Sequence, residues 1–200
     1  MKSDSDIIKE RLDAMPDCFD WLKQLALRYL GKGCRLQEGC IRLGRFRKYD
    51  HDHFHITIFP PAEPDWLVER RSFEVPLDYL KLLSHMNGLR LFEMRLFGFT
   101  PSMQGSFPRL DRSRLQCLDL TAANETWTID MKNAPGGFIY FGSGFYSSKE
   151  NKEFFMNEAG NIRALLKRGI ELGGWPSLWA LIAQEGAAEE QRVMASESDV

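Results

Sequence analysis

The sequence has few of the features that mark a catalytic or metal-binding centre. Its 200 residues include four cysteines, Cys18, Cys34, Cys40 and Cys117, and none of them belongs to a Cys-x-x-Cys pair or a paired zinc spacing. A Gly-x-Ser-x-Gly nucleophile elbow is absent, and so is the Gly-Lys-Ser/Thr ending of a P-loop. These absences remove the usual sequence signs of a zinc protein, a serine hydrolase and a P-loop NTPase.

Long apolar runs are also absent. No stretch approaches the about 18 consecutive apolar residues of a membrane-spanning helix. The first 17 residues contain no apolar signal core. We therefore expect a cytoplasmic protein with reduced thiols, and a Cys34–Cys40 disulfide is the alternative if the chain is exported.

The overall charge is small, but it is unevenly distributed. A formal net charge of −2 gives no global attraction to nucleic acid or to an anionic membrane, so we expect neither as a direct partner. Residues 28–50 carry seven basic and two acidic side chains, whereas residues 184–200 carry one basic and five acidic ones. The basic segment is either the solvated face of a hairpin or a surface for an acidic partner. Its arginines Arg42, Arg45 and Arg47 are our first candidates for partner contact.

Apolar spacing predicts helices and strands that alternate irregularly. Helical spacing predicts helices over residues 6–15, 17–30, 75–88 and 173–185. Period-two spacing predicts strands over residues 40–48, 53–60, 89–99 and 136–144, followed by a hairpin over residues 152–166. Because this order lacks βαβ regularity, it predicts an α+β fold with a mixed or antiparallel sheet flanked by helices.

A single domain accommodates all of these elements. Residues 1–65 contribute the first helices and a hairpin to it, and residues 66–186 form its core. No linker or internal repeat divides the two parts. Residues 187–200 are small, acidic and aperiodic, which predicts a disordered tail.

Three of the four histidines alternate at the start of the second hairpin arm: His51, His53 and His55. Imidazoles at alternate strand positions point one way and are good metal ligands, and a neighbouring aspartate could add an oxygen ligand. However, the intervening Phe54 and the following Ile56 are apolar, which predicts that the histidines take the solvent side. His51 also falls in the predicted turn, over residues 49–52. We expect the histidines to line the polar side of the hairpin, and a metal site is the alternative.

The segment from Gly142 to Lys152 is polar and contains glycine, which predicts a loop between strands. Within it, Phe145 and Tyr146 lie near Lys149 and Lys152 in the sequence. Aromatic residues are enriched at protein interfaces. Phe145 and Tyr146 are therefore our second candidates for partner contact.

Residues 75–99 resemble a motif of the SUKH superfamily, the Smi/Knr-related proteins. In that family a helix of the form Pro-x-x-Tyr-x-x-x-Leu ends in Asn-Gly, and the strand that follows leads to a glycine-containing turn. The matching positions are Pro76, Tyr79, Leu83, Asn87, Gly88 and Gly98. Further on, the resemblance extends to a strand with Phe138, Ile139, Phe141 and Gly142 and to a hairpin that turns at Gly160. It covers residues 66–186 and ends in a closing helix.

The resemblance implies an α+β domain without enzymatic activity or cofactor. Bacterial members serve chiefly as immunity proteins that bind and neutralise a cognate polymorphic toxin, and fungal members act as scaffolds in cell-wall signalling. The matched residues are implied to be fold determinants: Tyr79 and Leu83 in packing, Gly88 as a positive-φ stop, and Phe138 and Ile139 in the central strand. No catalytic residue is implied.

We therefore expect a non-enzymatic immunity protein whose partner is a toxin or effector domain. A regulatory scaffold or adaptor is the alternative, and it predicts several partners of modest affinity. A metal-dependent enzyme built on the histidine hairpin is the second alternative.

Overall fold

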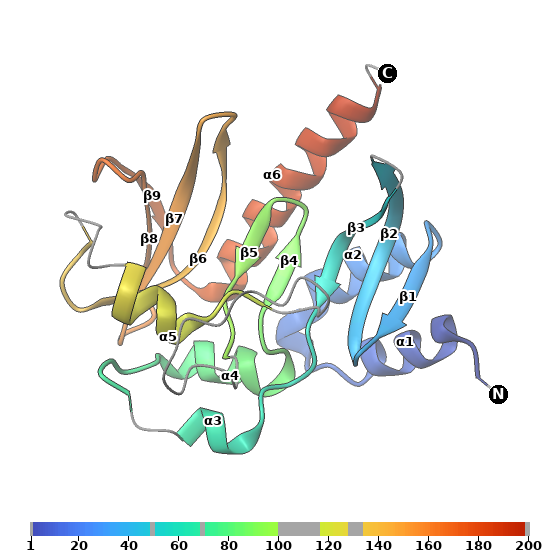
Figure 1. Cartoon of the computed structure of the whole chain (residues 1–200), viewed down its shortest axis with the longest axis horizontal. Helices are drawn as coiled ribbons and strands as arrows, with labels where there is room; N and C mark the ends of the chain where they lie inside the picture. The colour runs from blue at the N-terminus through green and yellow to red at the C-terminus, as the bar shows by residue number, and fades with distance from the viewer. Residues whose placement is uncertain (1, 49–50, 69–70, 100–116, 128–133, 199–200) are drawn as a thin grey trace.

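The computed structural model describes residues 2–48, 51–68, 71–99, 117–127 and 134–198. Nine strands form one open antiparallel sheet, and each strand pairs with its neighbours along the chain (Figure 1). The strands are β1 (Cys34–Gln37), β2 (Cys40–Lys48), β3 (His51–Ile58), β4 (Leu89–Leu91), β5 (Met94–Leu96), β6 (Phe138–Ser147), β7 (Glu150–Asn157), β8 (Ile162–Leu165) and β9 (Glu171–Trp175). The predicted α+β class with an antiparallel sheet is confirmed.

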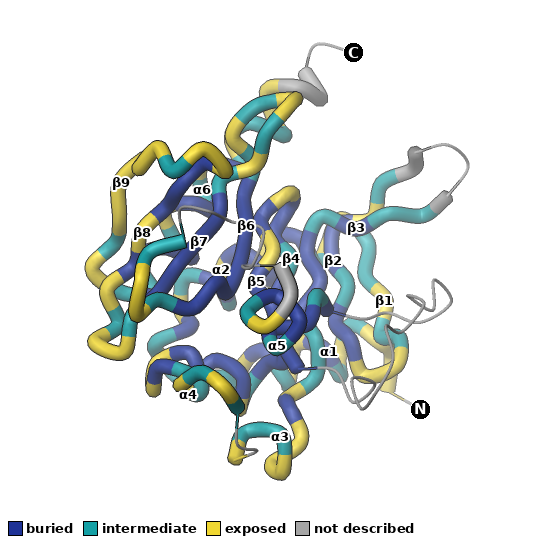
Figure 2. Tube along the Cα trace, turned by 60° about the vertical axis from the view of Figure 1, so that its left-hand side comes forward, coloured by how far each residue is buried: buried dark blue, intermediate teal, exposed yellow. Residues whose placement is uncertain are grey.

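Helices flank this sheet on both sides. They are α1 (Asp4–Asp13), α2 (Asp20–Leu30), α3 (Pro64–Val68), α4 (Leu77–His85), α5 (Leu120–Ala122) and α6 (Leu178–Ser198), with two short helical turns, η1 (Asp17–Phe19) and η2 (Ala123–Trp127). In Figure 1, α2 and α6 lie behind the sheet and α5 lies in front of β6 and β7. Buried residues gather in the middle strands, whereas β9 at the edge is largely exposed (Figure 2).

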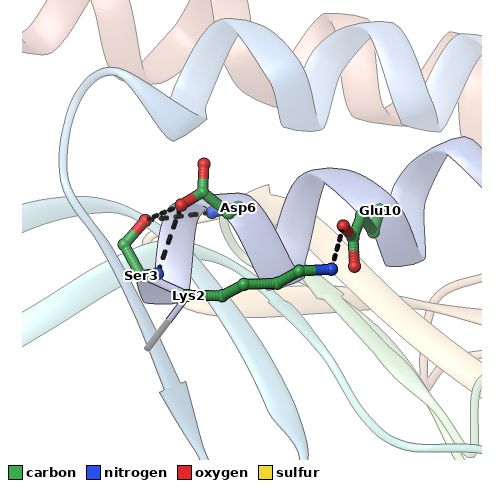
Figure 3. Close-up of polar contacts among 4 residues, drawn as sticks. All are labelled: Lys2, Ser3, Asp6 and Glu10. Atoms are coloured by element: carbon green, nitrogen blue, oxygen red, sulfur yellow. Dashed lines mark hydrogen bonds and ion pairs between the residues drawn. The ribbon is translucent and has the colours of Figure 1, made fainter.

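The first helix begins at a capping box. The Ser3 hydroxyl accepts a hydrogen bond from the Asp6 backbone N–H, and the Asp6 carboxylate accepts one from the Ser3 N–H (Figure 3). Lys2 adds an ion pair with Glu10. Because the box satisfies two backbone N–H groups that lack partners within the helix, it defines the start of α1.

One apolar row of the sheet faces the helices. Ile41, Ile58, Leu89 and Leu96 lie directly opposite one another on β2, β3, β4 and β5, and all four are buried. Gly142 and Phe154 continue this row on β6 and β7. The same buried cluster includes residues of α2 and α6, so the helices and this face of the sheet form the core.

The hydroxyl of Tyr79 connects α4 to the middle of the sheet. It is fully buried, 2.6 Å from the carbonyl oxygen of Phe97 and 3.1 Å from that of Phe141. Burial raises the pKa of Tyr79 well above its usual value, so the hydroxyl stays a donor. Since the two carbonyls follow β5 and belong to β6, a single side chain links three elements.

The end of α4 is held by a second polar contact. The Asn87 side chain donates to the Phe99 carbonyl and accepts from the Phe99 N–H, both at 2.6 Å. Gly88 follows with φ of 102°, a conformation that side chains with a Cβ rarely adopt. Pro76 is buried just before α4, and Leu83 is buried within it.

Other positions of the matched motif lie in the second half of the sheet. Ile139 is buried in β6, and the Phe138 ring lies 5.1 Å from the Arg163 guanidinium carbon. A Cβ added at Gly142 would lie 2.6 Å from the Arg95 carbonyl oxygen, so glycine permits the close approach of β5 and β6. Gly160 has φ of 80° in the turn between β7 and β8, as the predicted hairpin requires.

One predicted strand and one predicted loop need correction. Residues 89–99 do not form one strand, because a turn at Phe92 and Glu93 divides them into β4 and β5. Phe92 has φ of 55°, and a positive φ is uncommon for residues other than glycine, so the sequence did not predict this turn. Likewise, the predicted loop that begins at Gly142 is strand as far as Ser147, where β6 ends.

The predicted disordered tail is also wrong over most of its length, because α6 continues to Ser198. Three glutamates of α6 have cationic partners: Glu185 with Lys152, Glu189 with Arg192 of the same helix, and Glu190 with Arg28. The Glu189 carboxylate also accepts a hydrogen bond from the Phe145 N–H at 3.1 Å. The contacts of Glu185 with Lys152 and of Glu189 with the Phe145 N–H join α6 to the β6–β7 hairpin and stabilise an acidic segment that lacks apolar periodicity. The predicted core residues of this helix, Leu178, Leu181 and Ile182, are buried.

We expect Tyr79→Phe to lower the free energy of unfolding by about 1–3 kcal/mol, because a buried carbonyl loses its donor while the ring volume is kept. Urea unfolding measures this difference. Tyr146→Phe is the matched control, since Tyr146 is 48% exposed. Equal stability of Tyr79→Phe and the wild type would contradict the role given to this hydroxyl.

We expect Gly142→Ala to destabilise the protein by about 1–3 kcal/mol, because the added methyl group would press on β5. Gly136→Ala is the control, since a Cβ there would meet no atom within 4 Å. Thermal and urea unfolding of both variants should separate them. If Gly142→Ala is as stable as Gly136→Ala, the close approach of β5 and β6 is not required.

Candidate anion-binding face

The face of the sheet opposite the apolar row carries a line of arginines. The register places Arg35 opposite Arg42, Arg42 opposite Thr57, and Thr57 opposite Arg90. Arg90 in turn lies opposite Arg95. Because neighbouring residues of a strand point to opposite faces, these side chains point away from the apolar row. We call Arg35, Arg42, Arg90 and Arg95 the arginine row.

A pocket of about 210 Å³ opens within the arginine row. Its lining consists of three arginines, several apolar residues, one histidine, one threonine and one cysteine: Arg42, Arg90, Arg95, His53, Phe54, Thr57, Phe59, Leu89, Leu96, Cys117 and Leu118. No carboxylate belongs to this lining, within the part of the chain that the structure describes. Among the residues that the structure describes, the lining is therefore cationic and contains no counter-charge.

Arg42 is held firmly at the edge of this pocket. Its guanidinium carbon lies 4.2 Å from the centre of the Phe54 ring, and Nη1 donates to the Gln37 side-chain oxygen at 3.0 Å. Nε is buried and makes no hydrogen bond to any described residue. Burial lowers the pKa of Arg42, and the neighbouring charges of Arg35 and Arg90 lower it further. An anion in the pocket would offset both effects.

Arg90 has a similar environment. Burial is the main cause that lowers the pKa of Arg90, and the charge of Arg95 adds to it. Its Nε donates to the Phe92 carbonyl at 3.3 Å. Arg95 itself is exposed beside the pocket. Like charges are thus held close together at a partly desolvated site, as in protein sites for carboxylates and phosphates.

The row continues on β6 and β7 with uncharged and acidic side chains. Arg95 lies opposite Ser143, and Ser143 lies opposite Glu153. Glu153 is buried, and its carboxylate accepts a hydrogen bond from the Tyr140 hydroxyl. Burial raises the pKa of Glu153, and the bond from Tyr140 offsets part of that rise. This carboxylate is engaged by Tyr140 and does not line the pocket.

The first set of predicted contact residues, the arginines at positions 42, 45 and 47, does not lie together at the pocket. Arg42 belongs to the pocket, whereas Arg45 is exposed and pairs with Asp52 at 2.9 Å. The side chain of Arg47 lies outside the described residues. Asp52 also lies 3.6 Å from Arg35, at the outer end of the row.

The second set of predicted contact residues, Phe145 and Tyr146, lies on β6 and not at the pocket. Phe145 packs beneath the guanidinium of Arg192, whose carbon is 4.1 Å from the ring centre, and Tyr146 is exposed. Both belong to β6, four strands from β2 in the sheet. This separation is roughly 19 Å at about 4.8 Å per strand, so the two sets do not form one compact site.

Arg90 and Arg95 were missed by sequence reasoning. Each is the middle residue of a three-residue strand, in Leu89–Leu91 and Met94–Leu96. In a single strand over residues 89–99, they would not be cross-strand neighbours. The repeat of an arginine between two apolar residues, on both sides of Phe92 and Glu93, is the signal that could have revealed the hairpin.

The histidine hairpin differs from the prediction at His55. The Phe46 ring stacks on His53 at 5.4 Å and on His55 at 4.3 Å. His55 also contacts the rings of Tyr29 in α2 and Phe92, at 5.7 and 5.4 Å. His55 is therefore half-buried against the helix side and does not line a solvent face.

The reason is a break in strand alternation. Gly44, across from His55, has φ of 68°, and a Cβ there would collide with the Tyr29 ring. Phe54 accordingly lies under Arg42 and is not part of the main apolar cluster with Ile56. The strand β3 begins at His51, so the turn is shorter than predicted, and the His51 side chain lies outside the described residues. Among the residues that the structure describes, no three His, Cys, Asp or Glu side chains are grouped so that they could hold a metal ion.

Comparisons with protein-family models, with curated proteins and with solved structures find no match for this chain. The resemblance to the SUKH superfamily therefore depends on the sequence motifs alone. Within the described part of the chain, none of the helices is both long enough and apolar enough to cross a membrane.

We expect a pH-dependent contribution of Glu153 to stability. Its pKa is raised in the folded state above the ordinary value of 4.5, so the folded state retains its proton longer than the unfolded state. The resulting stability is present below the ordinary pKa and is lost as the pH rises through the folded-state pKa. Urea unfolding of wild type and Glu153→Gln at about pH 4 and about pH 8 tests this. The advantage of the wild type over the variant should shrink at the higher pH, and a constant difference would contradict the burial of an ionisable carboxyl.

Proposed function

We propose that the chain is a non-enzymatic immunity protein that binds a cognate toxin or effector domain through the arginine row. One observation carries the proposal: three arginines surround a pocket whose described lining contains no carboxylate. A partner with an exposed acidic patch would supply the missing charge. The motifs shared with the SUKH superfamily support the choice of an immunity protein among binding proteins.

The chemistry of the pocket favours binding over catalysis. Arginine remains protonated at physiological pH and is a poor general base. The pocket contains one thiol, Cys117, and burial raises its pKa to about 12. A thiol with that pKa is a weak nucleophile at neutral pH. The arginines and the thiol can hold an anion more readily than they can transform one, and His53 is the residue of the described lining whose type commonly serves as an acid or base.

Electrostatic recognition also fits the overall charge of the protein. The net charge is −2, so the arginine row is a local positive region on a chain that is slightly acidic overall. Local complementarity of this kind accelerates association and selects partners. In the proposal, the protein meets its partner in the cytoplasm of the cell that produces both.

The experiment that tests the proposal begins with capture of the partner. The tagged full-length chain is expressed in its own cells, and proteins that co-purify at equal stoichiometry are identified. Co-expression then shows whether the chain relieves the toxicity of the captured protein. One partner whose toxicity is relieved supports the proposal, whereas several partners of modest affinity without toxicity would favour a scaffold and contradict it.

We expect the double variant Arg90→Ala/Arg95→Ala to weaken partner binding by about 30-fold or more, because truncating one side of a close charge pair costs about 2 kcal/mol or more. Protection from toxicity should fall with it. Arg163→Ala is the matched control, since this exposed arginine lies on β8 away from the pocket. Unchanged affinity of the double variant, with its fold intact by circular dichroism, would exclude the arginine row as the contact surface.

A further inference from the structure

We propose that the pocket between Arg42, Arg90 and Arg95 is a receptor for one carboxylate, supplied by a glutamate or aspartate side chain of the partner protein. This inference rests on the proposed function and names the chemical group that the arginine row recognises. The carboxylate occupies the recess itself, while the rest of the partner lies over the exposed arginines around it.

The two described carboxylates that act on the charges of Arg42 and Arg90 do not fill this role. Asp52 acts on the charge of Arg42, but its carboxylate lies 2.9 Å from the Arg45 guanidinium. Glu93 acts on the charge of Arg90, and it is exposed in the turn after β4. Neither residue belongs to the lining of the pocket. Since the described lining contains no carboxylate, we infer that its three arginines bind an external anion.

Arg42 is positioned in advance for a planar, two-oxygen ligand. Its guanidinium is stacked on Phe54 and anchored through Nη1 to Gln37, while the buried Nε has no partner among the described residues. A guanidinium presents its N–H groups in a fixed fork that matches the two oxygens of a carboxylate. Because the side chain is already ordered, little conformational entropy is lost when an anion binds.

The size and lining of the pocket favour a single side chain over a polymer backbone. A volume of about 210 Å³ accommodates a small group, and the apolar part of the lining suits the methylene groups of an acidic side chain. Single-stranded nucleic acid needs aromatic rings on which bases can stack. Two phenylalanines, Phe54 and Phe59, belong to the described lining, and Phe54 is buried with 4% exposure beneath Arg42 and offers no open face.

The test uses the purified full-length chain and glutarate as the carboxylate probe. The side-chain Nε–Hε signal of Arg42 and the backbone signals of Thr57 and Arg90 are followed by nuclear magnetic resonance at constant ionic strength. Inorganic phosphate and a short uridine oligonucleotide are titrated in parallel. We expect saturable shifts with glutarate that are larger and occur at lower concentration than those with phosphate.

Arg42→Lys is the decisive variant, because lysine keeps the charge and loses the planar fork. We expect glutarate binding to weaken about tenfold or more in Arg42→Lys and to be unchanged in Arg163→Ala. Circular dichroism and urea unfolding verify that both variants fold. Absence of saturable shifts, equal binding by Arg42→Lys, or tighter binding of phosphate or of the oligonucleotide would each overturn the inference.

The two proposals can fail separately. If glutarate binds and Arg42→Lys abolishes this, but no captured protein is neutralised by the chain, the carboxylate site stands and the immunity function fails. If a toxin is captured and neutralised equally well by Arg42→Lys, and glutarate does not bind, the immunity function stands and the carboxylate site fails.

Discussion

The backbone hydrogen bonds between β2, β3, β4 and β5 hold four strands in one register, and the environment of each side chain follows from that register. Ile41, Ile58 and Leu89 fall on the helix side, where α2 and α6 bury them. Their immediate neighbours Arg42 and Arg90 fall on the other side. A shift of one residue on β2, β4 or β5 would place arginines in the core. The same constraint thus stabilises the fold and creates the cationic face.

A few buried contacts hold the rest of the chain to these strands. Tyr79 connects α4 with the carbonyls of Phe97 and Phe141, and Asn87 binds both backbone groups of Phe99. The absence of a side chain at Gly142 lets β6 approach the short strand β5. The two halves of the sheet meet at this point, through two paired positions between β5 and β6.

Charged side chains have different partners in the two halves of the sheet. Near β6 and β7, the acidic side chains of α6 are paired within the protein, Glu185 with Lys152 and Glu189 with Arg192. At β2, β4 and β5, the described lining of the pocket has three arginines and no carboxylate. Glu185 and Glu189 thus have cationic partners within the protein, whereas Arg42, Arg90 and Arg95 meet no carboxylate in the described lining of their pocket. This contrast is the physical basis for placing recognition on the arginine row.

Sequence reasoning succeeded where local pattern determines structure. The spacing of Leu178, Leu181 and Ile182 predicted the buried side of α6, and the strand over residues 40–48 was predicted with its observed bounds. Sequence reasoning failed where an uncommon backbone conformation or a contact between distant residues determines the structure. The positive φ of Phe92 creates the β4–β5 turn, and contacts with Lys152 and the Phe145 N–H keep α6 ordered.

The candidate site could be predicted only in part for the same reason. Arg42 was identified from the basic composition of its segment, but its grouping with Arg90 and Arg95 depends on the pairing of four strands. Composition contains no information on that register. The path of His55 towards Tyr29 likewise depends on the backbone at Gly44, which strand alternation does not anticipate.

Arginine footprinting of the complex tests the central claim most directly. The chain is treated with phenylglyoxal alone and with its captured partner, and the modification of each arginine is quantified by mass spectrometry. We expect Arg90 and Arg95 to be protected in the complex, while Arg163 on β8 and Arg168 in the turn between β8 and β9 react equally in both states. Protection confined to Arg163 and Arg168 would place the partner elsewhere and contradict the account.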